Sequence, residues 1–365
     1  AFGDSGVGST EQRRLAARMA ADTFDLAIHT GDVTYGSSST SGAGTHQTLN
    51  DWFFEIYKDW LRRRPFFPSI GNHDNEIAYA RPYRQVFVLP PDAVSSGYAD
   101  HAERFYSFDF GPAHFVALDT ELAFQDSARR AAQLAWLEAD LANTAQPWRI
   151  VYFHRPPFSS STGHGSNLTV RRAFVPLFER YGVQLVISGH DHNYERSTPW
   201  RQTSGGKPVT YVVTGGGGAK LYGVGQSAWT VRSLSAHHYV RANVTDCALY
   251  LVAVGLDGQK LDGMTLDRCA QERDARAPSV SIGSPASGAS VRGVVTVAVS
   301  ASDDQKVEKV DLRIGGSLVA IDATTPYSFA WDTRTAANGS RQIEARAYDI
   351  AGRVSSASRT VTVAN

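Results

Sequence analysis

Short apolar runs alternate with stretches of helical periodicity over residues 1–270. The apolar runs are predicted strands, and they cover residues 25–29, 66–70, 114–118, 149–153, 183–187 and 210–213. The predicted helices, in which apolar residues recur at helical spacing, cover residues 11–21, 48–64, 127–143 and 167–181. Strands that alternate with helices are typical of an α/β layer structure, which is the fold class that we expect for this region.

A different pattern fills residues 279–365, where apolar and polar residues alternate in short segments separated by Gly, Asn and Asp. Seven such segments without a convincing helix predict an all-β sandwich of the immunoglobulin-like type, although the cysteine pair of that fold is missing. The charged stretch 271–278, which ends in a proline, is the predicted linker. We therefore expect two domains, over residues 1–270 and 279–365.

Composition excludes several classes of protein. The 365 residues are 42% hydrophobic and 20% charged, which excludes a disordered or collagen-like chain. Lys and Arg together number 36, as do Asp and Glu, so no net charge attracts nucleic acid or an anionic membrane surface. No apolar run approaches the ~18 residues that cross a bilayer. We expect neither an obligate nucleic-acid partner nor a membrane span.

The cysteines and the first residues bear on the compartment. Cys247 and Cys269 can close one loop of roughly twenty residues, worth about 3 kcal/mol if oxidised, and one disulfide favours an exported protein. Residues 1–4 read as the end of a strand, so we expect an N-terminal strand truncated by processing or by disorder, with a signal peptide lost in the same way. The abundance of Arg, Ala and Gly is typical of a GC-rich bacterial genome. A secreted or periplasmic location is therefore expected.

Five short polar clusters stand at the ends of predicted strands, where open α/β sheets bind their ligands. The clusters cover residues 4–6, 31–35, 71–74, 151–154 and 189–192. They supply two Asp, one Asn, one Tyr and three His, namely Asp4, Asp32, Tyr35, Asn72, His154, His190 and His192. A single Asp at a strand end is commonly a helix cap or turn residue. Five clusters in order instead predict oxygen and imidazole ligands for two metal ions.

The last cluster favours two ions over one. Alternate residues at the end of a strand diverge, so His190 and His192 can reach neighbouring metals. In two-metal phosphoryl sites the ions lie about 3.5 to 4 Å apart, and a carboxylate such as Asp32 can bridge them. The residues alone do not assign that bridge.

In order and content, these clusters resemble those of the purple acid phosphatases, within the calcineurin-like metallophosphoesterase superfamily. The resemblance covers about residues 1–255 and extends to residues 154–157, 195–196 and 214–218. It implies a layered metallophosphoesterase β-sandwich flanked by helices, which here precedes a bacterial Ig-like domain. It also implies a ferric ion and a divalent ion, which is zinc, manganese or ferrous iron. The implied ferric ligands are Asp4, Asp32, Tyr35 and His192, and the implied divalent ligands are Asp32 as bridge, Asn72, His154 and His190.

Two positions separate this family from its relatives. The wider superfamily usually has His and Asp where this chain has Gly6 and Tyr35. A phenolate is a strong anionic donor to Fe(III), whose charge removes a proton that in water leaves only near pH 10. The alternative for Tyr35 is a buried aromatic residue with one hydrogen bond.

Other polar residues of the clusters are candidates for supporting roles. His73 matches a substrate-facing histidine of the family, and His164 resembles another that contacts phosphate or protonates the leaving group. The alternative for His164 is a solvated loop residue. Asp74 and Asp191 could orient neighbouring imidazoles or cap surface turns.

The sequence therefore predicts a binuclear metal-dependent hydrolase of phosphate monoesters, of acid phosphatase type. Its expected chemistry is attack by metal-activated hydroxide, with His73 or His164 as the general acid. A related phosphodiesterase or nucleotidase is one alternative. Another is a surface-binding protein whose Ig-like domain binds cell-surface or polymeric material and carries the main function.

Overall fold

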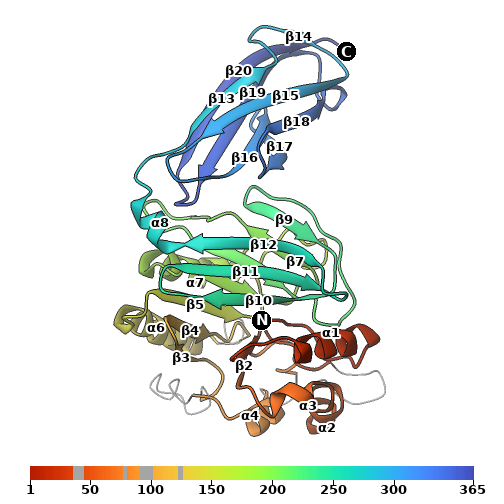
Figure 1. The fold of residues 1–365 in the computed structure, drawn as a ribbon, viewed down its shortest axis with the longest axis vertical. Coiled ribbons are helices and arrows are strands. Elements are labelled where there is room, and N and C mark those ends of the chain that lie inside the picture. Colours follow the sequence, from red (N-terminus) through yellow and green to blue (C-terminus); the bar gives the residue numbers. More distant parts are fainter. Residues whose placement is uncertain (36–44, 77–79, 91–101, 122–125) are drawn as a thin grey trace. The chain divides into compact units, whose positions relative to one another are not determined.

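The computed structural model describes residues 1–35, 45–76, 80–90, 102–121 and 126–365, and the chain forms two compact units (Figure 1). The first unit comprises residues 1–196, 201–225 and 232–266. The second comprises residues 197–200, 226–231 and 267–365. The domain boundary predicted near residue 270 stays a prediction.

A seven-stranded sheet of order β3-β4-β5-β6-β8-β7-β9 dominates the catalytic region predicted for the first unit. Its strands are β3 (Tyr106–Phe110), β4 (Ala113–Ala117), β5 (Trp148–Phe153), β6 (Leu185–Ser188), β7 (Tyr194–Ser197), β8 (Thr210–Thr214) and β9 (Thr230–Leu234). β4, β5, β6 and β8 run parallel, so their carboxyl ends lie at one edge. β6 is buried along its whole length, so its sequence is a run of apolar residues and does not alternate between apolar and polar residues.

Two smaller sheets accompany it. β1 (Ala27–His29) and β2 (Phe66–Pro68) pair in parallel, and Phe2 bridges to His29 on the other side of β1. β10 (His238–Val244), β11 (Ala248–Gly255) and β12 (Lys260–Asp267) form a three-stranded sheet (Figure 1). One apolar core contains Ile150 and Ile187 of the large sheet together with Leu251 of β11. The first unit is thus the layered α/β sandwich that the sequence predicts.

The helices of the first unit have defined starts. They are α1 (Thr10–Ala21), α2 (His46–Leu49), the π-helical turn η1 (Asn50–Phe54), α3 (Glu55–Leu61), α4 (Arg81–Val86), α6 (Ser127–Asn143) and α7 (Leu168–Tyr181). Asp126 and Asn167 cap α6 and α7 by accepting backbone N–H groups of the first turn. The single helix predicted over 48–64 is instead divided by η1, whose Phe53 is fully buried.

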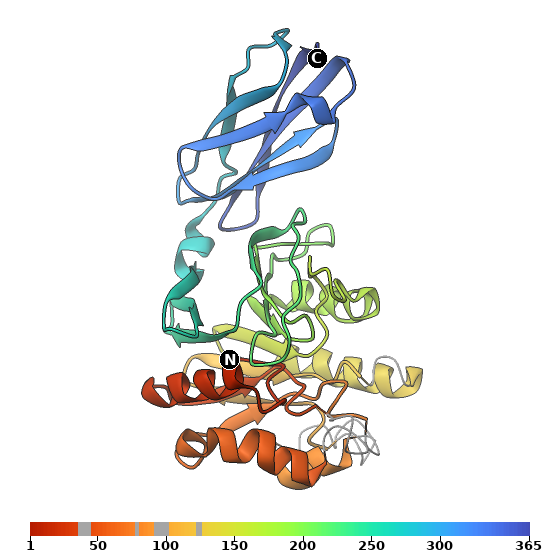
Figure 2. The same cartoon turned by 90° about the vertical axis from the view of Figure 1, so that its right-hand side faces the viewer.

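The second unit is an all-β sandwich, whose strands form two layers (Figure 2). One sheet has the order β13-β15-β18 and the other β14-β20-β19-β16-β17. The strands are β13 (Ser279–Ser284), β14 (Ser290–Val291), β15 (Val294–Ser302), β16 (Val307–Ile314), β17 (Ser317–Asp322), β18 (Tyr327–Asp332), β19 (Gly339–Asp349) and β20 (Val354–Val363). A core around Val297, Leu312 and Trp331 fills the space between the sheets. A 3-10 turn, η4 (Thr333–Thr335), follows β18.

The predicted linker partly forms a helix, since α8 (Arg268–Arg273) precedes β13. The two cysteines of the chain, Cys247 and Cys269, are disulfide-bonded. Within the described ranges, no helix is both long and apolar enough to span a bilayer.

Candidate metal centre

All seven predicted metal ligands lie just beyond the carboxyl ends of parallel strands or of the bridge at Phe2. Asp32 and Tyr35 follow β1, Asn72 follows β2, His154 follows β5, and His190 and His192 follow β6. Asp4 follows Phe2, whose bridge to His29 is also parallel. Because parallel strands end at the same edge, residues that are far apart in sequence converge there.

One group of side chains unites Asp4, Tyr35 and His192. The Tyr35 hydroxyl donates to Asp4 Oδ1 at 3.1 Å and lies 3.1 Å from His192 Nε2. His192 Nε2 is in turn 3.4 Å from Asp4 Oδ1. These three atoms, a carboxylate oxygen, a phenol oxygen and an imidazole nitrogen, form half of the predicted centre.

A second group unites Asn72, His154 and His190. His154 Nε2 lies 3.0 Å from Asn72 Oδ1 and 3.1 Å from His190 Nδ1. Both His154 and His190 are buried. These are the three ligands, besides the bridge, that the resemblance implies for the divalent ion.

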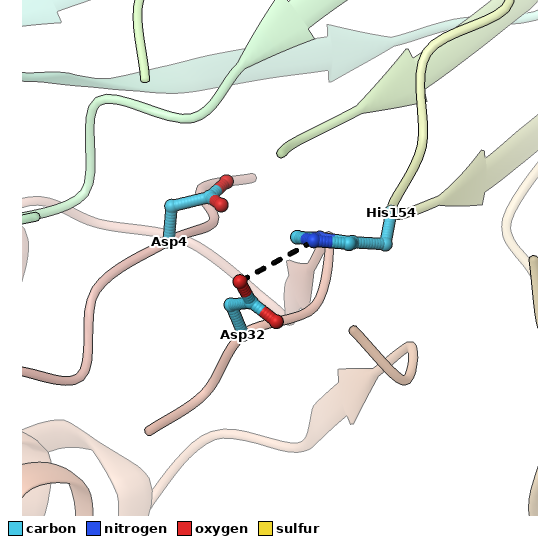
Figure 3. A group of neighbouring side chains, drawn as sticks. All are labelled: Asp4, Asp32 and His154. Atoms are coloured by element: carbon cyan, nitrogen blue, oxygen red, sulfur yellow. Dashed lines mark ion pairs between the residues drawn. The ribbon is translucent and has the colours of Figure 1, made fainter. Parts of the chain in front are cut away.

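Asp32 faces both groups. Its Oδ2 is 3.3 Å from His154 Nε2, and Asp4, Asp32 and His154 each offer one ligand atom within 4.8 Å of the others (Figure 3). In Figure 3 the carboxylates of Asp4 and Asp32 and the ring of His154 point toward one another. On the other side, Asp32 lies close enough to Tyr35 to raise the pKa of its hydroxyl. This position is compatible with a bridging carboxylate.

The hydrogen bonds of two histidines define which ring nitrogen is available. Nδ1 of His154 lies 3.0 Å from the Thr30 carbonyl, and Nδ1 of His192 lies 2.7 Å from the Lys220 carbonyl. Because a carbonyl only accepts, each Nδ1 carries the hydrogen, and Nε2 is left for a metal ion. Backbone carbonyls are the usual partners that orient a metal-binding imidazole in this way.

The electrostatics of the centre favour positive charge at its middle. Burial alone would raise the pKa of Asp32, but His154 and then His73 lower it well below its usual range. Burial likewise lowers the pKa of His154, yet Asp32 outweighs it and raises the value to about 10. The centre thus favours positive charge between Asn72, His190 and Asp32, where a metal ion would meet the same ligands. The residues present therefore fit a bound metal.

The pKa of Tyr35 likewise favours positive charge in the group of Asp4, Tyr35 and His192. Burial, followed by the Asp4 and Asp32 carboxylates, raises the pKa of the Tyr35 hydroxyl well above 10. A phenolate at this position needs a concentrated positive charge beside it. A trivalent ion between Asp4, Tyr35 and His192 would supply that charge.

The backbone is strained at three of the predicted ligands. Asp4, Asp32 and His190 have φ of 59°, 53° and 66°, a left-handed conformation that non-glycine residues rarely adopt. Close packing holds them there, because a Cβ on Gly71 would meet Asp32 Oδ1 at 2.1 Å and one on Gly189 would meet Asp4 Oδ2 at 2.4 Å. Such strain clusters at functional sites.

The two candidate general acids flank opposite halves of the centre. His73, about one third exposed, has its ring 4.5 Å from that of Tyr35, and its Nε2 lies 4.0 Å from Asp32 Oδ2. Its Nδ1 contacts Glu76 at 2.6 Å. The exposed His164 stacks on His190, with 4.1 Å between ring centroids. Both predicted histidines therefore reach the centre.

Asp74 and Asp191 orient backbone rather than imidazole rings. Asp74, fully buried, accepts the N–H groups of Val33 and Gly71 at 3.0 Å. Asp191, also fully buried, accepts the N–H group of His164 at 2.9 Å. The two carboxylates thus hold the loops that carry the ligands, and neither is a surface cap.

Sequence reasoning assigned no role to three residues beside the centre. Arg155 Nη1 lies 3.1 Å from His190 Nε2, while its Nε donates to Glu121 at 2.7 Å. The ring of Tyr222 stacks on His192 at 4.2 Å. Arg155 directly follows His154 and could have been found by that adjacency, whereas nothing around Tyr222 marks it.

The sequence profile of the calcineurin-like phosphoesterases matches residues 1–194, more than half of the chain and the whole set of strand-end clusters. The chain belongs to the calcineurin-like phosphoesterase family. The profile of the bacterial Ig domain matches residues 278–345, in agreement with the predicted second fold.

Relatives of this phosphoesterase include acid phosphatases. It is 26% identical to acid phosphatase type 7 of Homo sapiens over 73% of the chain and 66% of that protein. It is 29% identical to purple acid phosphatase 21 of Arabidopsis thaliana over 53% of the chain and 44% of that protein. An uncharacterized protein of Mycobacterium tuberculosis is 30% identical over 52% of the chain and 38% of its own length. The chain thus spans less than two thirds of each relative.

A solved structure shares the fold of the phosphoesterase. The purple acid phosphatase from yellow lupin seeds superimposes with a TM-score of 0.61 and 22% sequence identity, covering 73% of this chain and 52% of the lupin chain. Membership of the family implies a phosphoesterase with a binuclear metal centre, and the two groups of ligands described above have the residue types that such a centre needs.

Proposed function

We propose that this phosphoesterase hydrolyses phosphate monoesters as a purple-acid-phosphatase-like enzyme, with Fe(III) and a divalent Zn, Mn or Fe ion. The observation that carries the proposal is the Tyr35 hydroxyl, which lies 3.1 Å from both Asp4 Oδ1 and His192 Nε2. A hydroxyl between an anionic oxygen and an imidazole nitrogen supports a role as metal ligand over that of an isolated core phenol. Hard anionic oxygens at this position favour iron(III).

Each ion has its own ligands in this proposal. Asp4, Tyr35 and His192 would hold Fe(III), Asn72, His154 and His190 would hold the divalent ion, and Asp32 would bridge the two. The bound ions would supply positive charge to the phosphate ester and an activated water as nucleophile.

The remaining residues of the centre act on the ester itself. His73 presents Nε2 toward the centre while Glu76 accepts at Nδ1, an arrangement that suits an imidazolium proton donor. His164 and Arg155 lie beside His190 on the opposite side and can bind the phosphate oxygens. We propose His73 as the donor of the proton to the leaving group, since a metal ligand, Asn72, directly precedes it.

Turnover of matched aryl phosphates tests the reaction. The iron-loaded protein should hydrolyse nitrophenyl phosphate at least about a hundredfold faster than bis-nitrophenyl phosphate, because three unesterified oxygens are available to two cations and their neighbours. An Asp32→Asn protein serves as control for contaminating phosphatase and should be inactive on both. A preference for the diester would instead identify a phosphodiesterase.

The cellular location of the protein is a further part of the proposal. The Cys247–Cys269 disulfide favours an oxidising environment, and we propose a secreted or periplasmic protein on this ground. Fractionation of the source bacterium with an antibody to the chain would test it. Recovery from the cytoplasm alone would contradict it. Binding of cell-surface material by the Ig-like domain stays a prediction.

A further inference from the structure

Three aspartates of the second unit meet at one end of the sandwich. Asp274 ends α8, Asp303 follows β15, and Asp349 is the last residue of β19. Each offers a carboxylate oxygen, and the three oxygens lie within 4.8 Å of one another. Segments separated by up to 75 residues of sequence thus bring like charges together, which is unfavourable unless something compensates for it.

One oxygen of each carboxylate is used by the protein. Asp303 Oδ2 accepts the backbone N–H groups of Gln305 and Lys306 at 2.9 and 3.0 Å. Asp349 Oδ1 accepts those of Ala351 and Arg353 at 2.9 and 2.7 Å.

Asp274 Oδ1 completes this set, since it accepts from Arg353 Nη1 at 3.0 Å. These bonds fix the orientation of all three carboxylates.

The other oxygen of each carboxylate is buried and has no hydrogen-bond partner among the residues that the structure describes. These atoms are Asp274 Oδ2, Asp303 Oδ1 and Asp349 Oδ2. The side chains of Asp274 and Asp349 are almost fully buried, at 2% and 0% exposure. Buried carboxylate oxygens without a donor are costly and rare in folded proteins. Three such oxygens at one place indicate a site for a cation.

Arg353 does not neutralise the group. Its Nη1 is 3.0 Å from Asp274 Oδ1 and 3.7 Å from Asp349 Oδ2, and its Nη2 donates to the Asp274 backbone carbonyl at 2.6 Å. Three ionised carboxylates and one guanidinium leave two negative charges. Burial, together with the neighbouring acidic groups, raises the pKa of Asp274 and that of Asp349, the latter to about 6. A divalent cation would match the remaining charge.

We propose that Asp274, Asp303 and Asp349 bind a calcium ion in the Ig-like domain, separate from the metal centre of the phosphoesterase. Ligands that are all oxygen select a hard cation. Ca²⁺ commonly binds several protein carboxylates, whereas Mg²⁺ keeps several waters and binds through one or two carboxylates. Three carboxylates that meet at one place therefore suit calcium. Bound calcium would connect the end of α8 to the ends of β15 and β19, which belong to opposite sheets.

Calcium binding by the full chain, loaded with its catalytic metals, tests the proposal. Radioactive Ca²⁺ in equilibrium dialysis against excess Mg²⁺ would count the ions bound. The Asp303→Asn variant should bind Ca²⁺ at least about tenfold more weakly at this site, since ligand charge sets the affinity. The matched control is Asp322→Asn, because Asp322 also accepts a backbone N–H two residues on but lies outside the group. It should bind like the unaltered chain.

Thermal unfolding gives a second measurement, which does not require counting bound ions. Calcium should raise the unfolding midpoint of the Ig-like domain in the unaltered chain and in Asp322→Asn, and should raise it less in Asp303→Asn. Phosphatase activity at saturating catalytic metal should be equal in all three, so a wrong function assignment would not affect this result. Equal calcium binding by the three proteins, or none by the unaltered chain, would overturn the proposal.

Discussion

At the scale of single residues, Tyr35 gives the most direct test of the metal centre. Its hydroxyl contacts Asp4 and His192, so a bound Fe(III) should take it as a phenolate and absorb visible light by charge transfer. Tyr35→Phe should abolish the visible band and weaken iron binding. Tyr222→Phe is the matched control, because the Tyr222 ring packs on His192 and His164 and its hydroxyl is not one of the predicted ligands. A visible spectrum that Tyr35→Phe leaves unchanged would exclude Tyr35 as a ligand.

His73 allows the general acid to be separated from metal binding. A general acid contributes typically 10² to 10⁴ in rate, and less when the leaving group is already good. His73→Ala should therefore retain both metals, slow an alkyl phosphate by at least about a hundredfold, and slow nitrophenyl phosphate much less. Kinetics on the two esters, with metal analysis of each protein, would measure this difference.

The matched variant for that comparison is His164→Ala, which removes the histidine on the other side of the centre. We expect it to raise KM for both esters with a smaller effect on kcat, because His164 stacks on His190 and lies where phosphate would bind. If His73→Ala slows both esters equally, His73 is at most a phosphate ligand and His164 takes over the role.

The residue types at strand ends predicted which side chains converge at this edge, because ligand chemistry restricts which side chains serve. That these side chains bind metal stays a prediction. The partners that hold those residues were harder to predict. Asp74 and Asp191 occur beside ligands, but whether a carboxylate accepts from a ring or from backbone depends on loop conformation. Tyr222 arrives from a distant loop, so no local pattern indicates that it stacks on His192.

At the scale of secondary-structure elements, His114 connects three of them. It lies on β4, and its two ring nitrogens contact Asp109 of β3 at 2.7 Å and Asp140 of α6 at 2.8 Å. Burial lowers the pKa of His114, but Asp140 and then Asp109 outweigh it and raise the pKa above its usual value. The folded state therefore holds the His114 proton more tightly than the unfolded chain does.

This raised pKa predicts a pH dependence of stability. The contribution of His114 is complete below its unfolded pKa of about 6.5 and is lost as the pH rises through the higher folded value. His114→Gln should therefore reduce the free energy of unfolding more at about pH 6 than at about pH 9. Urea unfolding of both proteins at the two pH values would measure it. An equal loss at both would show that the ion pairs do not contribute.

The elements predicted best are those with a single environment along their length. The helix over 127–143 is predicted with the bounds that α6 has, because one face is apolar and Asp126 caps its start. β10, β11 and β12 were not predicted. For β12 the reason is that it is only partly buried and shows no clear alternation of apolar and polar residues. The division of residues 48–64 by η1 was not predicted either, because a π-helical turn differs from an α-helix in its i→i+5 hydrogen bonds, which the residue types do not specify.

At the scale of the whole molecule, the change of pattern near residue 271 predicts that the catalytic region folds without the sandwich. A chain that ends at residue 276 keeps the disulfide and every proposed ligand of the binuclear centre. It should be soluble and retain most of its activity on nitrophenyl phosphate. Activity and the circular dichroism spectrum would be compared with those of the full chain. An insoluble or inactive product would mean that the predicted boundary is not a functional one.

The left-handed backbone at Asp4, Asp32 and His190 also has an evolutionary consequence. Glycine would adopt these φ values freely, whereas each other residue there costs about 1 kcal/mol. A lineage selected only to stay folded would drift toward glycine at these positions and lose the phosphoesterase in doing so. Sequence design that optimises stability alone would follow the same course. Asp or His at such a position, where it also meets other predicted ligands, is therefore a feature that a search for undescribed enzymes could use.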